Sequence, residues 1–138
     1  MNDEEFEQQK QRVHALIERW VHPIGLHLWD ITFLWSRETP DDAVMRCEAH
    51  WEYLCATITV YLPRVQEYTN DARLEVIFVH ELMHIFLKEA RWADEARELS
   101  MEHEEHVATL LAKAFVWVRD AAQRGEAPAL PLETKHDE

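Results

Sequence analysis

Basic residues are scarce in this sequence. Fourteen Lys and Arg stand against 27 Asp and Glu, which leaves a formal net charge of −13 at pH 7. A nucleic-acid backbone or an anionic membrane surface is bound through a basic protein surface. We therefore expect neither nucleic acid nor a membrane among the partners of this chain.

Long apolar runs are also lacking. No run approaches the roughly 18 residues that a membrane-spanning helix needs. The first residues are polar and acidic, whereas a secretory signal begins with a basic stretch and an apolar core. These two absences predict a cytoplasmic location.

Cysteine occurs only twice, at Cys47 and Cys55. Two irregularly placed cysteines are too few for a disulfide framework or for a zinc site built from cysteines. Both fall in segments that alternate like strands, where they would lie on opposite faces of a sheet. We therefore expect both thiols to remain reduced.

Apolar residues are plentiful by comparison, at 47% of the chain, so bulk disorder is excluded. Helical periodicity predicts three helices, at residues 3–21, 72–90 and 100–122. Period-two alternation predicts three strands between the first two helices, at residues 28–35, 44–51 and 54–62, the last two joined as a hairpin. The tryptophans at four positions are interpreted as core residues: Trp20, Trp29, Trp35 and Trp117.

This order of elements predicts an α+β domain over residues 1–122. The length of the chain, 138 residues, fits one domain. Residues 123–138 hold two prolines and end in charged residues, with neither helical nor strand periodicity. We interpret them as a flexible C-terminal tail.

The second predicted helix contains the sequence His80-Glu81-Leu82-Met83-His84. Side chains four residues apart lie on one side of a helix, so both imidazoles can bind one metal ion, and neutral imidazole is a good zinc ligand. Glu81 lies about 100° further round the helix, where it reaches a water on the metal instead of the metal itself. Its carboxylate could then take the proton of that water and pass it to a leaving amine.

The alternative explanation of this motif is chance, because the chain is rich in His and Glu. In that case His80 and His84 would be hydrogen-bonded core residues. However, the motif is flanked by apolar residues at 76–79 and 85–86. Polar groups in such a helix are costly to bury without partners or a metal, which favours a metal site.

A catalytic zinc usually has three protein ligands and one open position. The third predicted helix begins near Glu102-His103-Glu104-Glu105-His106, and acidic residues there could equally serve the helix dipole.

Glu104 extends an apolar stripe through Val107 and Leu111 that we expect to face inward, so we favour it as the third ligand. Glu105 lies on the same side of the helix as Thr109 and Lys113, a side that we expect to face water. The alternatives to Glu104 are Glu105 and then His103 or His106.

His80, Glu81, His84 and Glu104 together resemble the gluzincin zinc peptidases, the thermolysin-like group. These enzymes carry His-Glu-x-x-His on one helix and a glutamate on the next. The order of elements over most of residues 5–122 resembles the minigluzincins and the small zinc-peptidase-like proteins of phages. The resemblance implies a zincin-like fold and a Zn²⁺ ion bound by the two histidines and Glu104, with Glu81 as general base.

The resemblance also implies that an extended peptide lies antiparallel to strand 54–62, at the edge of the sheet. It implies that the C-terminal tail can cover the cleft and inhibit the protein. Gluzincins often carry a supporting Asp four residues after the third ligand, a position that is Ala108 here, or Thr109 counted from Glu105. The sequence leaves the residue that stabilises the oxyanion open among four candidates: His50, Tyr68, His103 and His106.

The function expected from the sequence is that of a zinc metalloendopeptidase acting on a peptide or protein substrate. The first alternative is a non-catalytic, zinc-containing peptide- or protein-binding module derived from such an enzyme. The second alternative is a structural protein without a metal.

Overall fold

The computed structural model describes residues 1–93 and 101–125. These residues form four α-helices, two short 3-10 helices and a three-stranded sheet. The α+β class predicted from the sequence is therefore confirmed. The helices are α1 (Asp3–Trp20), α2 (Leu62–Glu67), α3 (Asp71–Ala93) and α4 (Met101–Gln123), and the strands are β1 (Asp30–Ser36), β2 (Met45–His50) and β3 (Cys55–Tyr61).

Local sequence signals set the start and the end of α1. The Asn2 side chain accepts a hydrogen bond from the Glu5 backbone N–H at 2.8 Å, and the Glu5 carboxylate accepts one from the Asn2 N–H at 3.0 Å. This reciprocal capping box satisfies two backbone donors that a helix start would otherwise leave unpaired. After the helix, Gly25 adopts a left-handed backbone (φ 87°), which favours glycine and turns the chain toward β1.

The strands lie in the order β1-β3-β2, with β1 parallel and β2 antiparallel to β3. The predicted hairpin of the second and third strands is thus confirmed. The expectation that strand 54–62 forms the sheet edge is wrong, because β3 is paired on both sides. A hairpin fixes only one pairing, and the sequence does not show which side of it the first strand joins. The edge strands are β1 and β2.

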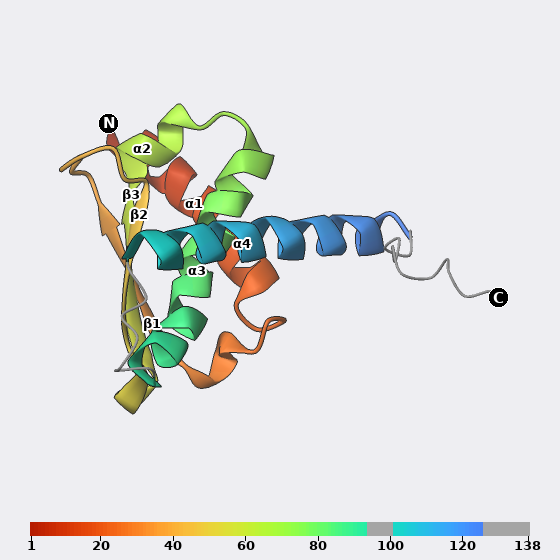
Figure 1. Ribbon diagram of the computed structural model, residues 1–138. Coiled ribbons are helices and arrows are strands. Elements are labelled where there is room, and N and C mark those ends of the chain that lie inside the picture. The colour runs from red at the N-terminus through yellow and green to blue at the C-terminus, as the bar shows by residue number, and fades with distance from the viewer. Residues whose placement is uncertain (94–100, 126–138) are drawn as a thin grey trace.

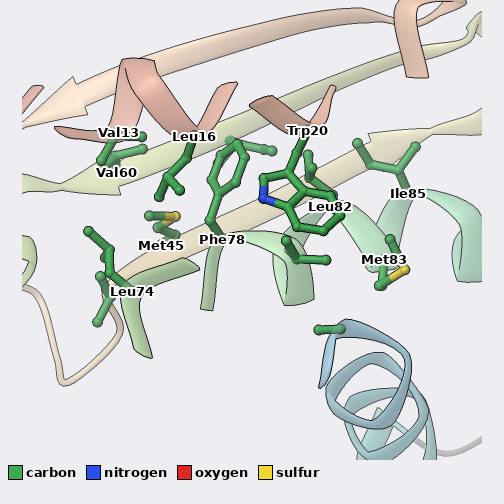
Figure 2. Packing of buried hydrophobic residues seen from close by; sticks show 14 of the residues in the cluster. Val13, Leu16, Trp20, Met45, Val60, Leu74, Phe78, Leu82, Met83 and Ile85 are labelled. Carbon is green, nitrogen blue, oxygen red and sulfur yellow. The ribbon is translucent and has the colours of Figure 1, made fainter. Parts of the chain in front are cut away.

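Helices α1, α3 and α4 lie on the same side of the sheet (Figure 1). Met45 and Val60 project from the sheet toward this layer, where they pack with Phe78 of α3 and Leu16 of α1 (Figure 2). The register places Cys47 beside Ile58 on this inner face and Cys55 beside His50 on the other, and both thiols are free. The expected placement of the cysteines on opposite faces is confirmed.

Helix α4 packs against α3 through small side chains, of which Ala108 and Ala112 are fully buried. Alanines allow two helices to approach closely. They therefore form the contact with α3 that we had expected larger residues to form. Trp117, which we had interpreted as core, is exposed, and so are the large apolar residues Leu110, Phe115 and Val118. The buried face of α4 is therefore rotated from the predicted one.

Within the described ranges, no helix has both the length and the apolar character required to cross a bilayer. Of the predicted tail, residue 123 still belongs to α4, and residues 126–138 lie outside the described part of the chain. The expectation that this tail covers the cleft therefore also concerns residues outside the described part of the chain.

Candidate metal centre

Helix α3 brings His80 and His84 together, as their spacing predicts. The opposite side of the helix carries Phe78, Leu82 and Ile85, which are fully buried in the core. This packing fixes the rotation of α3, so that the two half-buried imidazoles face a cleft, with ring centroids 4.8 Å apart. Their Nε2 atoms are 3.1 Å apart.

The Nδ1 atoms of both rings are held by residues of α4. His84 Nδ1 is 2.9 Å from the Glu104 carboxylate, and His80 Nδ1 is 2.9 Å from the Thr109 hydroxyl. If the Glu104 carboxylate is ionised, it accepts a hydrogen bond from Nδ1 of His84, and Nε2 of a neutral imidazole is then the nitrogen with the lone pair. If His80 donates to Thr109 in the same way, two lone pairs face each other at 3.1 Å, where a cation would stabilise them.

Glu105 completes this group. One of its carboxylate oxygens is 2.9 Å from Nε2 of His80, and the other is 3.1 Å from Nε2 of His84. Ligands about 2.0–2.1 Å from a tetrahedral zinc lie roughly 3.3 Å from one another, close to these distances. His80, His84 and Glu105 can therefore hold a metal ion, since their ligand atoms all lie within 4.8 Å of one another.

The two neighbouring carboxylates have different positions from those expected. Glu104 is buried, as predicted, but its carboxylate contacts the Nδ1 side of His84. Glu105 is exposed, as expected, with 53% of its side chain accessible, but its carboxylate also lies at the two Nε2 atoms, and Thr109 contacts His80. The cause is the rotation of α4, because its alanine face lies against α3. His103 and His106 are exposed and do not line the cleft.

Burial dominates the electrostatics of the motif. It raises the pKa of Glu81 to about 8, with a further increase from the Glu105 carboxylate and an opposing effect of Arg46. Burial, together with the charge of His84, lowers the pKa of His80. Both shifts favour the uncharged forms, and the neutral imidazole is the form that binds a metal.

The cleft beside these residues has a volume of about 880 Å³. It is bordered by residues 43–49, which include most of edge strand β2, and by α3 and α4. Burial, followed by the charge of Glu81, raises the pKa of Cys47 in this cleft to about 12, which favours the protonated thiol near neutral pH.

Two hydrogen-bond donors of the cleft relate to the expectations from the sequence. Tyr68 is the single member of the four predicted oxyanion candidates that lines it. Arg46 also lines it and forms an ion pair with Asp41. The place of Arg46 in the cleft could not be predicted from the sequence. Arg46 alternates along the strand like any outward-facing residue, and no local signal distinguishes it.

Comparison with known protein families, with curated proteins and with solved structures gave no match to this chain.

Proposed function

We propose that this protein is a zinc-dependent peptidase with a zincin-like fold, in which His80, His84 and Glu105 hold the metal. The observation that carries the proposal is the convergence of two Nε2 atoms and one carboxylate, while each Nδ1 atom has its own partner on α4. Histidines that bind metals commonly have such a partner, which fixes the tautomer and the ring orientation. Two histidines that only pack in the core would need no carboxylate at their Nε2 atoms.

Zinc, when bound, would polarise the attacking water and the scissile carbonyl. Glu81 follows His80 directly in the helix and lines the same cleft. Its carboxylate would accept the proton of the water and deliver it to the leaving nitrogen. Burial of Glu81 favours the proton-bearing form, which suits the delivery step, and the nearby Arg46 favours the ionised form that accepts the proton.

The edge strand β2 supports binding of an extended peptide. Residues 43–49 border the cleft, and an edge strand presents unpaired backbone N–H and C=O groups. A substrate could add to this edge as a further strand through main-chain hydrogen bonds. Tyr68 and Arg46 are two of the cleft residues that could donate to an oxyanion.

The variant Glu81→Gln tests this proposal. The amide cannot accept a proton, so we expect zinc content and fold to be kept, while cleavage of a mixed peptide library falls by about 10²–10⁴-fold. Elemental analysis and mass spectrometry of the digest measure the two properties. Glu38→Gln is the matched control, because Glu38 is an exposed carboxylate that does not line the cleft, and it should retain activity.

If Glu81→Gln cleaved peptides as fast as the parent, the general base would be another residue. If the zinc-loaded parent cleaved no peptide but bound peptides in the cleft, the second candidate would be supported, a non-catalytic zinc-containing binding module. One observation favours that candidate, since the neutral Thr109 stands where gluzincins often carry a supporting Asp.

A further inference from the structure

Helix α4 carries a second apolar surface on the side turned away from α3. We name it the outer stripe, and it consists of Leu110, Ala114, Trp117 and Val118. The exposed fractions of its large members are 60% for Leu110, 52% for Trp117 and 45% for Val118. Their i, i+4, i+7, i+8 spacing is that of a helix face packed against a partner, and a helix that is apolar all round is normally covered on every side.

The outer stripe borders an apolar groove of about 490 Å³. The groove is lined by aromatic residues of three helices, Trp20 of α1, Phe86 of α3 and Phe115 of α4. Phe86 and Phe115 are exposed there. Phe115 lies about 160° round the helix from Trp117, so the groove flanks the outer stripe and is not part of it.

Charge distribution indicates which partner fits this surface. The chain has a net charge of −13, yet residues 107–123 contain only three charged residues, Lys113, Arg119 and Asp120. Two copies of so acidic a protein repel each other, and the repulsion is weakest where α4 is nearly neutral. A second copy of this chain can therefore approach here.

Lys113 and Asp120 make the surface complementary to itself. They lie on the same flank of the outer stripe, seven residues apart, a separation of about 10.5 Å along a helix. Within residues 1–93 and 101–125, neither side chain has an ion-pair partner. An antiparallel copy related by a two-fold axis between residues 116 and 117 would place each Lys113 beside the Asp120 of the other copy.

We propose that this protein forms a symmetric dimer in which the outer stripes of two α4 helices pack antiparallel. The Trp117 side chains of the two copies meet at the axis, and two reciprocal Lys113–Asp120 pairs flank them. The axis lies about 17 Å along α4 from Glu105, so both clefts stay open. The dimer is independent of the peptidase function proposed above.

Sedimentation equilibrium of the full chain over a wide concentration range tests this proposal. We expect a dimer for the parent and a monomer for Trp117→Glu, and likewise for Leu110→Glu if the first variant folds poorly. Leu28→Glu is the control, because Leu28 is 74% exposed and lies outside α4, so its variant should remain a dimer. A monomeric parent, or a Trp117→Glu variant that still dimerises, would overturn the proposal.

Exchange of the two charges tests the arrangement of the helices. Lys113→Glu places like charges together twice, so it should weaken the dimer at least about tenfold. Lys113→Glu combined with Asp120→Lys should restore the parental dissociation constant, because the reciprocal pairs form again with reversed signs. Failure of this double variant to restore dimerisation would overturn the antiparallel two-fold arrangement.

Discussion

Two buried carboxylates, Glu75 on α3 and Glu104 on α4, have opposite surroundings. Each side chain belongs to a residue only 5% exposed. Glu75 forms an ion pair with Arg19 at 2.7 Å and accepts a hydrogen bond from the Trp20 indole at 3.0 Å. The positive charge that Glu75 requires is therefore supplied by the chain itself, and the pair joins α1 to α3.

Glu104 lies instead beside His84, and the next carboxylate, Glu105, lies at the Nε2 atoms of His80 and His84. Burial lowers the pKa of His80, so this imidazole contributes little positive charge near neutral pH. These two carboxylates of α4 therefore lie against imidazoles, whereas Glu75 lies against a guanidinium. The comparison shows that one buried carboxylate joins two helices through an arginine, while the other contacts a histidine of the group that could hold a metal ion.

The largest effect expected from this difference is the loss of the metal. His84→Ala removes a ligand and leaves Glu104 without its imidazole partner, so zinc affinity should fall by orders of magnitude. Elemental analysis of the purified variant, with Glu75→Gln prepared in parallel, measures this loss. Full zinc retention by His84→Ala would contradict the metal centre.

Glu104 and Glu105 should differ in a side-by-side competition against a chelator. Glu105→Gln removes a charged ligand, so zinc affinity should fall by orders of magnitude. Glu104→Gln removes a partner that orients His84, and a loss of about 10–100-fold is expected. If Glu104→Gln released zinc more readily than Glu105→Gln, the ligand expected from the sequence would be the correct one.

Glu75→Gln should affect stability without affecting the metal. Loss of the ionised partner of Arg19 should lower the free energy of unfolding by about 2 kcal/mol, less than for a fully buried pair because Arg19 is partly exposed. Urea denaturation measures this change, and zinc content should equal that of the parent. Release of zinc by Glu75→Gln would show that the two clusters are coupled.

The smallest effect is expected at Thr109. Replacing its hydroxyl by a methyl group in Thr109→Val removes the hydrogen bond to Nδ1 of His80, and zinc affinity should fall about tenfold. Thr109→Ser keeps the hydroxyl and serves as the control. Equal zinc affinities of the two variants would show that this contact does not orient His80.

The part of the site that lies on a single helix could be predicted from the sequence. The spacing of His80 and His84 alone places both imidazoles on one side of α3. The choice between Glu104 and Glu105 depends on the rotation of α4, and neighbouring residues differ by about 100°. Because α4 is apolar on nearly all sides, its large residues suggested a face that the structure leaves exposed, while Ala108 and Ala112 make the contact with α3.

The fold was predictable to a similar extent. Alternation located the strands within about two residues, because one face of each is buried. Helix α2 was missed, since Pro63 marked the end of a strand in the sequence, although proline also fits the first turn of a helix. The central position of β3 depends on which strands pair, and the alternation of apolar residues does not indicate the pairing.

The candidate ligands come from two helices, and this division couples the ion to stability. An ion bound to His80 and His84 of α3 and to Glu105 of α4 would act as a cross-link between these helices. Each tenfold rise in free zinc above the dissociation constant would then add about 1.4 kcal/mol to the free energy of unfolding. In a cell, the lifetime of the protein against proteolysis would follow the supply of zinc, so metal starvation would reduce its abundance as well as its activity.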